Sequence, residues 1–256
     1  MDYSYEQFKR EILRLTGIDL GLYKERQMKR RIDSLLVSKN YSDYFQYLMA
    51  LKKDQNLLDD FIEYTTINVS EFFRNPEQWK FLEEDILPKF QEKERITIWS
   101  AACSTGDEPY SLAMLLLKYY NKFKFKIYAT DIDEKAIKMA KAGEYSAKNI
   151  ANVPEEFKPY FTLQENGKYV ISDEIKKCVT FQKHNLFTDP FIRKVDILVC
   201  RNVLIYFTEE VKDKIFHQFY ESLNKGGILF LGNTEQMIDY KKIGFGRYAS
   251  FFYEKK

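Results

Sequence analysis

Residues 96–120 read ITIWSAACSTGDEPYSLAMLLLKYY. This stretch opens with a short apolar run that is typical of a buried strand, continues with small residues, and passes into an apolar helix pattern at Pro109–Tyr120. Strand patterns recur at residues 126–130, 179–182, 195–200 and 228–231, and helix patterns at residues 134–142 and 211–223. Strands that alternate with helices indicate right-handed β–α–β units, so the sequence predicts an α/β fold with a mostly parallel sheet.

The first ~65 residues have helical periodicity and no strand pattern. Ser4 and Gln7 have the spacing of a capping box, and further helix patterns cover about residues 23–38, begin at Ser42–Asp43 and begin near Gln55. We therefore expect a small all-helical N-terminal domain at residues 1–66, a linker that contains a helix at residues 67–94, and the α/β domain at residues 95–256.

Two segments depart from the alternation of strands and helices. Residues 161–164 and 169–171 flank Asn166-Gly167, which predicts a β-hairpin with a type I′ turn and hence a small insertion at about residues 160–178. Residues 250–254 read SFFYE and predict an antiparallel edge strand on the main sheet.

Composition excludes several classes of protein. Of 256 residues, 45% are hydrophobic and 30% charged, which excludes bulk disorder, and the net charge of +2 does not indicate a nucleic-acid or membrane partner. With only His184 and His217, a histidine-rich metal centre is excluded, and we expect no metal site. Three cysteines without a CxxC pair argue against a disulfide framework. No membrane-span or signal-peptide pattern occurs, so we expect a cytoplasmic protein.

The loop after the first strand, residues 101–109, favours a cationic ligand. Ligands of open α/β sheets bind at the carboxyl ends of the strands. This loop has a single glycine, Gly106, and it places Asp107 and Glu108 where a diphosphate would otherwise bind a helix N-terminus. Two carboxylates repel a diphosphate, whereas S-adenosylmethionine carries a sulfonium and an ammonium group and no phosphate.

The end of the second strand supplies a further acidic residue. Asp131 lies 25 positions after Gly106, where a carboxylate accepts hydrogen bonds from both ribose hydroxyls. The alternative for Asp131, and more so for Asp133, is to cap the helix that follows.

Four segments together resemble one family: TINVSEFFRN at residues 66–75, ACSTGDEPYS at 102–111, ATDID at 129–133 and CRNVLIYF at 200–207. They resemble the CheR family, the chemotaxis receptor glutamate O-methyltransferases that use S-adenosylmethionine and release S-adenosylhomocysteine. The match covers nearly the whole chain in order. It implies a Rossmann-like S-adenosylmethionine methyltransferase sheet with a small β-hairpin insertion behind an all-helical domain, in a monomeric protein that tunes sensory adaptation.

The resemblance also implies roles for individual residues. Asn68, Ser70 and Arg74 of the linker would reach the cofactor, with Arg74 also close to the reacting centre; Ser70 stands where family members usually have threonine. Glu108 would meet the charged end of the cofactor and Asp131 its ribose. Asn185 and Leu186 would flank the adenine, and Asn202 and Val203 would line the methyl-transfer side. Tyr206 would project toward the acceptor carboxylate, although a purely structural tyrosine is the alternative there.

The implied reaction needs no proton transfer. A glutamate side chain, with a reference pKa of about 4.3, is already ionised at neutral pH, and a sulfonium is already a good leaving group. Catalysis then depends on alignment of the two reactants, which contributes about 7–11 kcal/mol. We therefore interpret Arg74 and Tyr206 as positioning groups, and the scarcity of histidine is compatible with the reaction.

Residues 24–39 carry six bases and two acids, a local net charge of +4. At helical spacing Arg26, Lys29 and Arg30 lie opposite an apolar stripe, and we expect them to face solvent. A solvated face without a partner is the alternative. The resemblance implies that this helix docks the cytoplasmic helical region of chemotaxis receptors, and that the enzyme meets the membrane only through the receptor. In some family members the insertion adds a strand from a receptor C-terminal pentapeptide, which this sequence alone leaves open.

Three other functions remain as alternatives. One is a Rossmann-like methyltransferase that acts on amide or amine nitrogen; those enzymes commonly have a proline-aromatic motif after the fourth strand, where this chain has RNVL at residues 201–204. Another is a binding module that responds to S-adenosylmethionine without catalysis. The third is nucleic-acid binding, which the basic helix favours but the near-neutral total charge opposes.

Overall fold

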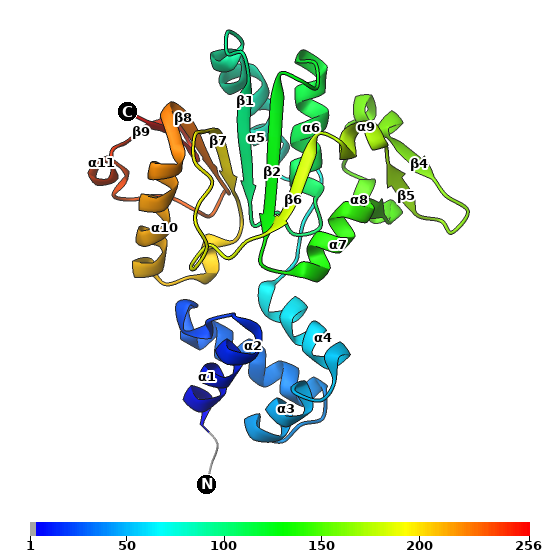
Figure 1. Cartoon of the computed structure of the whole chain (residues 1–256), viewed down its shortest axis with the longest axis vertical. Coiled ribbons are helices and arrows are strands. Elements are labelled where there is room, and N and C mark those ends of the chain that lie inside the picture. The colour runs from blue at the N-terminus through cyan, green and yellow to red at the C-terminus, as the bar shows by residue number, and fades with distance from the viewer. Residues whose placement is uncertain (1–3) are drawn as a thin grey trace. The chain divides into compact units, whose positions relative to one another are not determined.

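The computed structural model describes residues 4–256, which divide into two compact units (Figure 1). The helical unit comprises the residues up to Ile67 together with Leu204–Lys214, and the sheet unit comprises Asn68–Val203 and Ile215–Lys256. Within the described residues no helix combines the length and the apolar character needed to cross a membrane.

The helical unit contains α1 (Tyr5–Thr16), α2 (Glu25–Ser38), α3 (Tyr44–Leu51), α4 (Gln55–Thr66) and a short 3₁₀ helix, η1 (Leu20–Leu22). The predicted capping box is confirmed, because the Ser4 backbone N–H donates to Gln7 Oε1 at 2.8 Å and the Gln7 N–H donates to Ser4 Oγ at 3.3 Å. The Asp43 and Asp54 side chains accept N–H groups at the starts of α3 and α4. These three helices therefore begin where the sequence supplies an acceptor for the first N–H groups, whereas α2 begins after Lys24 without a side-chain cap.

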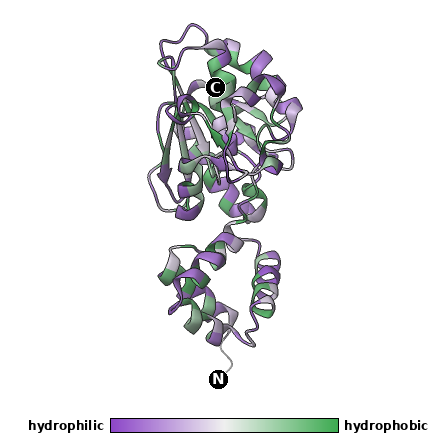
Figure 2. Cartoon of the chain, turned by 90° about the vertical axis from the view of Figure 1, so that its right-hand side faces the viewer, coloured by the Kyte–Doolittle hydropathy of each residue, from purple (hydrophilic) through white to green (hydrophobic). Residues whose placement is uncertain are grey.

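Aromatic side chains form the core of the helical unit. The Phe8 ring lies 6.4 Å from the Tyr47 ring and 6.0 Å from the Phe61 ring, and all three are fully buried. Burial of a side chain of this size contributes about 1.5–3 kcal/mol. In Figure 2 the helices of this unit carry both hydrophobic and hydrophilic residues, as amphipathic helices around a small core do.

The segment Leu204–Lys214, which follows the fourth predicted strand, packs within the helical unit. It opens with the 3₁₀ helix η5 (Leu204–Tyr206). The Lys24 N–H donates to the Tyr206 carbonyl at 2.9 Å, and the Tyr23 and Phe207 rings lie 4.9 Å apart. Tyr206 is thereby held directly at the start of α2.

The sheet unit contains a seven-stranded sheet in the order β6-β2-β1-β7-β8-β10-β9. Its strands are β1 (Ile96–Ala101), β2 (Phe125–Asp131), β6 (Val179–Lys183), β7 (Val195–Cys200), β8 (Leu223–Leu231), β9 (Phe245–Ala249) and β10 (Phe252–Lys255). β1, β2, β6, β7 and β8 pair in parallel, which confirms the predicted α/β class. The order reverses at β1, between β2 and β7, and this point is where open sheets bind ligands.

The prediction of an edge strand at residues 250–254 is wrong in one respect. β10 is antiparallel to β8, as expected, but β9 pairs with its other side and forms the edge of the sheet. Phe252 and Tyr253 are 1% and 2% exposed, and the Phe252 ring stacks 4.4 Å from Phe230. A strand with so much apolar surface is better buried inside the sheet than left at its edge.

Helices cover both faces of this sheet: α5 (Pro76–Phe81), α6 (Asp107–Tyr119), α7 (Glu134–Ala142), α10 (Glu209–Ser222) and α11 (Tyr240–Ile243). A π-turn and a 3₁₀ turn, η2 (Leu82–Ile86) and η3 (Leu87–Phe90), follow α5. Figure 1 shows α10 in front of β7 and β8, and α5 behind β1. Trp99 of β1 packs against Phe219 of α10 at 6.1 Å, while its neighbour Ile98 points to the opposite face and joins the core with Trp79.

The insertion is a three-stranded sheet rather than a hairpin alone. β3 (Glu144–Tyr145), β5 (Tyr169–Ile171) and β4 (Phe161–Leu163) pair in that order, with α8 (Ala147–Ile150), η4 (Glu155–Tyr160) and α9 (Asp173–Lys176) around them. The predicted type I′ turn is wrong, because Gly167 has φ 76° but Asn166 does not have a positive φ. The Gly167 N–H donates to Gln164 O and the Gln164 N–H to Lys168 O, which is the pattern of a turn followed by a glycine bulge.

Candidate active site

The loop between β1 and α6 is a tight turn at the carboxyl edge of the sheet. Ala102, Ser104 and Gly106 have φ of 62°, 49° and 91°. The Cys103 N–H donates to the Thr130 carbonyl of β2 at 2.9 Å, which fixes the loop to the neighbouring strand. A Cβ on Gly106 would come within 2.9 Å of the Ala140 Cβ of α7. Glycine is therefore required at position 106 for both its backbone angle and its close packing.

Asp131 ends β2 with its carboxylate turned toward this loop. Its Oδ2 accepts the Ser104 N–H at 2.7 Å, its Oδ1 accepts the Asp133 N–H at 3.0 Å, and the residue is 6% exposed. Burial raises the pKa of Asp131 to about 6, against the lowering effect of backbone hydrogen bonds from Asp133, Ser104 and Ile132. A carboxylate accepts about four hydrogen bonds, so acceptor capacity remains for a hydroxyl donor.

Asp133, and not Asp131, caps the following helix. Its Oδ1 accepts the N–H groups of Lys135 and Ala136 at 2.8 and 3.3 Å. Its Oδ2 accepts from Asn68 Nδ2 at 2.5 Å, and Asn68 Oδ1 in turn accepts the Ser104 hydroxyl at 3.4 Å. The linker residue Asn68 is thereby placed at the cofactor loop.

The two carboxylates at the start of α6 lie in different surroundings. Asp107 is fully buried and accepts the Thr105 hydroxyl at 2.6 Å; burial raises its pKa, and the hydroxyls of Thr105 and Ser70 oppose that effect. Glu108 keeps 13% of its side chain exposed and accepts the Ser100 hydroxyl at 2.8 Å. Burial raises the pKa of Glu108, whereas Arg201, 3.4 Å away, lowers it. Glu108 is therefore the carboxylate that a cationic ligand can reach.

Arg74 lies in a turn of the linker with an uncommon backbone. Phe73 and Asn75 on either side of it have φ of 50° and 63°. The Arg74 guanidinium donates to the Val69 carbonyl at 3.4 Å. The Arg74 carbonyl accepts from Trp79 Nε1 at 2.9 Å and from Arg201 Nη2 at 2.6 Å.

Asn185 and Leu186 follow β6 and lie beside Asp131, because the His184 N–H donates to the Asp131 carbonyl at 2.8 Å. The Asn185 side chain accepts the Phe187 N–H at 2.9 Å, and Leu186 is half-buried. The His184 ring packs 5.5 Å from Trp99, and its Nε2 lies 3.2 Å from the Pro190 carbonyl. His184 is thus a packing residue, as its neighbours in the sequence indicate.

Asn202 and Val203 follow β7, with Asn202 at φ 62°. The Asn202 N–H donates to Glu235 Oε2 at 2.7 Å, and the same oxygen accepts the Gly232 N–H at 2.9 Å. Sequence reasoning missed both Glu235 and Arg201, which are buried charged residues at the carboxyl ends of β8 and β7. The one signal for Arg201 was a charged residue directly after VDILVC, a strand buried at every position.

Hydrogen bonds place Asn68, Arg74, Glu108, Asp131 and Asn202 at this edge of the sheet, and the Ser70 hydroxyl acts on Asp107 there. Asn185 and Leu186 follow β6, and Val203 follows Asn202. Among residues 4–256, nine non-glycine residues have positive φ, and five of them belong to the segments that form this edge: Phe73, Asn75, Ala102, Ser104 and Asn202. Strained backbone of this kind gathers at functional sites.

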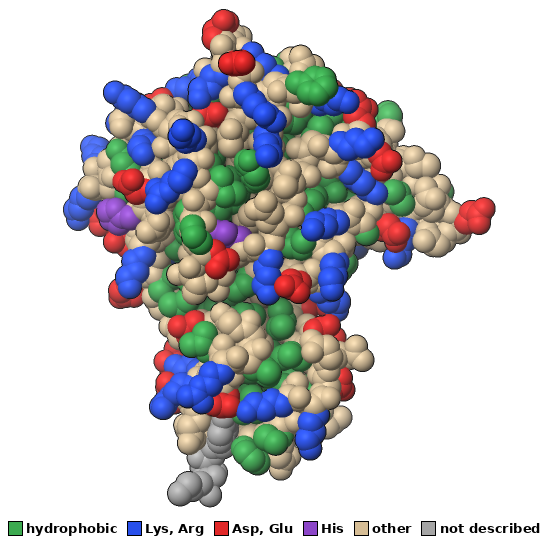
Figure 3. Space-filling model, in the orientation of Figure 1, with side chains coloured by type: hydrophobic (Ala, Val, Ile, Leu, Met, Phe, Trp, Pro, Cys, Tyr) green, Lys and Arg blue, Asp and Glu red, His purple; other side chains and the backbone are tan. Residues whose placement is uncertain are grey.

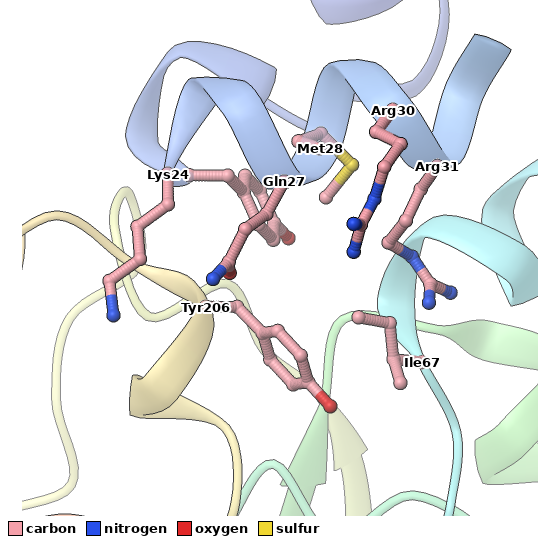
Figure 4. Close-up of a pocket in the computed structure, with 8 residues that line it drawn as sticks. Lys24, Gln27, Met28, Arg30, Arg31, Ile67 and Tyr206 are labelled. Carbon is pink, nitrogen blue, oxygen red and sulfur yellow. The ribbon is translucent and has the colours of Figure 1, made fainter.

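Tyr206 belongs to the helical unit, where it lines a pocket of about 170 Å³ beneath α2 (Figure 4). Lys24, Arg30 and Arg31 line the same pocket, which has no acidic residue in its wall; the other lining residues are Tyr23, Gln27, Met28 and Ile67. The Arg31 guanidinium stacks 4.6 Å from the Tyr64 ring and donates to the Tyr64 carbonyl at 2.6 Å. Figure 4 shows the Arg30 side chain pointing toward the space above the Tyr206 ring.

The three predicted docking cations differ in exposure. Arg26 and Arg30 are exposed, as predicted. Lys29 is only half-exposed, because its ammonium pairs with Asp33 at 2.9 Å and lies 5.8 Å from the Tyr5 ring and 5.7 Å from the Tyr44 ring. Lys29 thus faces solvent with 45% of its side chain exposed, while a neighbouring carboxylate and two rings contact its ammonium group.

Family models match both units of the chain. The model described as "CheR methyltransferase, all-alpha domain" matches residues 4–66, and "CheR methyltransferase, SAM binding domain" matches residues 68–247. The chain belongs to the CheR methyltransferase family. As a CheR protein it is an S-adenosylmethionine-dependent methyltransferase with a Rossmann-like sheet, and S-adenosylmethionine is its cofactor.

Curated relatives agree with this assignment. A chemotaxis protein methyltransferase of Listeria monocytogenes is 43% identical over 256 residues, which cover 99% of this chain and 97% of that protein. One of Borreliella burgdorferi is 36% identical over 234 residues, 86% of this chain and 83% of that protein. The solved structure of PKMT2 from Rickettsia typhi in complex with AdoHcy is 21% identical over 54% of this chain and 21% of its own, with a TM-score of 0.35.

The residues at the edge of the sheet fit this cofactor. Asp131 keeps acceptor capacity for a hydroxyl beside its backbone hydrogen bonds, which suits a ribose. Glu108 and Asp131 both have raised pKa values because burial leaves their charges incompletely compensated, and a cationic ligand supplies the missing compensation.

On the face seen in Figure 3, Lys and Arg side chains are scattered with Asp and Glu between them.

Proposed function

We propose that this CheR protein transfers a methyl group from S-adenosylmethionine to glutamate side chains of chemotaxis receptors, giving glutamate methyl esters and S-adenosylhomocysteine and so tuning sensory adaptation. One observation supports the choice of a carboxylate acceptor: neither His184 nor His217 is placed as a base at the site, and the carboxylates there are assigned to the cofactor. The His184 ring is packed against Trp99 and its Nε2 lies against Pro190 O, while His217 is exposed on α10. An amine acceptor must lose a proton before it attacks, whereas a carboxylate need not.

The thiols do not provide a base either. Cys103, Cys178 and Cys200 are buried free cysteines. Burial raises the pKa of each thiol, so that none ionises near neutral pH. An acceptor that is already ionised suits such a site.

The chain's own residues then bind the cofactor and orient the two reactants. When bound, S-adenosylmethionine supplies an electrophilic methyl group on a positively charged sulfur. Asp131 would accept hydrogen bonds from the ribose hydroxyls, and Glu108 would pair with the ammonium group. The Arg74 guanidinium would orient a carboxylate at the reacting centre, Asn68 and Ser70 would complete the linker side, and Asn185 and Leu186 would flank the adenine. Asn202 and Val203 would line the methyl-transfer side.

The helical unit serves as the receptor-docking domain in this proposal. Its pocket combines Tyr206 with Lys24, Arg30 and Arg31, a set of hydrogen-bond donors without an acidic side chain. Such a pocket suits the carboxylate of a glutamate, with Tyr206 as the group that orients it. Arg26 and Arg30 on the exposed side of α2 meet acidic residues of the helical cytoplasmic region of the receptor, and the complementary charge speeds encounter.

The test is a methylation assay with methyl-labelled S-adenosylmethionine and a cytoplasmic receptor fragment. We expect label on the receptor that mild base releases, as a methyl ester requires, and no label on a fragment whose acceptor glutamates are changed to alanine. Label that resists base would instead establish N-methylation. Binding of labelled cofactor and receptor without transfer would establish a binding module, and nucleic acid added in excess should not compete.

A further inference from the structure

Arg201, directly after β7, is a buried arginine with partners on two parts of the cofactor site. The residue is 7% exposed. Its Nη2 donates to the Arg74 carbonyl at 2.6 Å, to Gln78 Oε1 at 2.8 Å and to Asn75 Oδ1 at 3.1 Å, and its Nη1 donates to Glu108 Oε2 at 3.4 Å. Its guanidinium also lies 4.8 Å from the Phe230 ring.

Three of these four acceptors belong to residues 74–78, which we call the linker turn. Phe73 and Asn75 hold positive φ angles without being glycine, so the linker turn needs tertiary contacts to keep its shape. Arg201 binds both the main chain and two side chains of that turn. A planar guanidinium offers donors in fixed directions, which a lysine ammonium does not.

The fourth acceptor, Glu108, is the carboxylate that faces the cofactor. One guanidinium therefore contacts the turn that carries Arg74 and also the side chain of Glu108. Burial of a charged group is costly unless it is paired and hydrogen-bonded, and only one of the four acceptors here is a carboxylate. If Arg201 only filled space in the core, an apolar side chain would fill it without the cost of burying a charge.

We propose that Arg201 is a positioning residue, which fixes the linker turn relative to Glu108 and so sets the distance between Arg74 and Glu108 at the cofactor site. The inference rests on the roles proposed for Arg74 and Glu108, but not on the identity of the methyl acceptor. Arg201 itself does not touch the reacting atoms.

The charges around this contact give the proposal a readout that a purely structural role would not move. Glu108 is faced by Arg201 and by Glu235, and Arg201 is faced by Glu108, Glu235 and Arg74. The Cys103 and Cys200 thiols also lie close to Glu108. Removal of the Arg201 charge removes the chief influence that lowers the pKa of Glu108. A substitution that keeps the positive charge at position 201 but loses the planar guanidinium leaves this influence on Glu108 in place.

The test measures the affinity for S-adenosylhomocysteine by calorimetry across about pH 5 to 9 in full-length variants. Arg201→Lys keeps the charge and loses the fork; we expect its Kd to rise about 10- to 100-fold, while the pH at which binding weakens stays as in the wild type. Arg201→Met loses both the charge and the fixed directions of the donors. We expect a similar rise in Kd. As the pH falls, binding by this variant should begin to weaken at a higher pH than binding by the wild type. Arg193→Lys, at an exposed arginine, is the matched control and should change neither quantity.

A second variant changes the turn and leaves Arg201 intact. Asn75→Ala with Gln78→Met removes two acceptors of the guanidinium, and we expect about a 10-fold rise in Kd with no shift of the pH profile. In addition, Arg74→Lys combined with Arg201→Lys should raise Kd by less than the product of the single effects, because both act on one contact.

Wild-type affinity within about 2-fold in Arg201→Lys, or the same pH profile in Arg201→Met as in the wild type, overturns the proposal. If Arg201→Met lacks a cooperative thermal transition, the turn variant decides, and wild-type affinity there overturns the proposal as well. Because S-adenosylhomocysteine binding does not involve the methyl acceptor, failure of receptor methylation would leave this result intact.

Discussion

The backbone N–H of Ser104 donates a 2.7 Å hydrogen bond to Oδ2 of Asp131. This bond joins the loop after β1 to the end of β2, beside the point where the strand order of the sheet reverses. The buried carboxylate keeps acceptor capacity for a hydroxyl donor at the ligand edge of the sheet.

Asp131→Asn should weaken S-adenosylhomocysteine binding about 10- to 100-fold, because the variant loses a charged acceptor for the ribose hydroxyls. Asparagine can still accept the Ser104 N–H, so the loop should keep its shape. Asp54→Asn, at the N-cap of α4, is the matched control, because asparagine also caps helices well. Calorimetry that finds equal affinity in Asp131→Asn and the wild type would contradict the role of Asp131.

The pKa of Asp131 predicts opposite pH trends for binding and for stability. Burial raises that pKa to about 6, so binding that needs the ionised form should weaken as the pH falls from about 7 to 5. In the cofactor-free protein the folded state holds this proton more tightly than the unfolded state. The free energy of unfolding contributed by Asp131 should therefore decrease as the pH rises from about 4 to 6, by up to about 3 kcal/mol.

Denaturant unfolding of the wild type and Asp131→Asn at several pH values isolates this contribution, since the other carboxyl groups are common to both proteins. The stability difference between the two should shift in favour of the variant as the pH rises through this window. A difference that is constant with pH would mean that folding leaves the pKa of Asp131 unchanged, which would contradict the prediction.

Tyr206→Phe should lower the rate of methyl transfer about 10- to 100-fold and leave S-adenosylhomocysteine affinity unchanged, because the hydroxyl is proposed to orient the acceptor carboxylate. Single-turnover methylation measures the rate free of product release. Tyr64→Phe, which keeps the ring that Arg31 stacks on, is the control in the same unit. Unchanged turnover in Tyr206→Phe would identify it as a structural tyrosine.

Charge reversal at single cations of α2 should show which of them contribute to receptor docking. Arg26→Glu and Arg30→Glu should raise the KM for the receptor fragment, with a steep dependence on salt, because both side chains are exposed. Lys29→Glu should have a smaller effect on KM, since Lys29 already pairs with Asp33. Methylation kinetics from about 20 to 500 mM NaCl test this order. Equal KM values at all salt concentrations would exclude electrostatic docking by α2.

Local patterns predicted the elements whose ends are set by local contacts. α7 and β7 have the predicted bounds, residues 134–142 and 195–200, because a cap at Asp133 and a continuous apolar run define them. The order of strands at the edge of the sheet depends instead on how β10 packs, with Phe252 stacked on Phe230 of β8. This contact joins residues that are far apart in the chain, so local patterns do not predict it.

The site divides in the same way. Asp131 and Glu108 could be predicted because their distance along the chain from Gly106 reflects a recurring β–α–β geometry. Arg201 could not be predicted from spacing, because its partner Gln78 lies 123 residues away. The burial of a charge becomes understandable only when all of its partners are in place.

Gly106→Ala should lower both the stability of the protein and its affinity for S-adenosylhomocysteine. A Cβ at this position would lie 2.9 Å from the Ala140 Cβ, and φ of 91° disfavours any side chain. We expect a loss of about 2–4 kcal/mol in the free energy of unfolding, from overpacking and backbone strain together. Affinity should fall as well, because relief of the contact displaces the loop that binds Asp131.

Gly17→Ala supplies the matched control, since Gly17 has φ of 75° and no atom within 4 Å of the added Cβ. That variant carries the backbone strain without the clash, so it should lose only about 1 kcal/mol and keep wild-type affinity. Thermal unfolding and calorimetry on the same samples give both quantities. Equal losses of stability in the two variants would mean that strain alone explains Gly106, and that its packing against α7 is not what holds the cofactor loop in place.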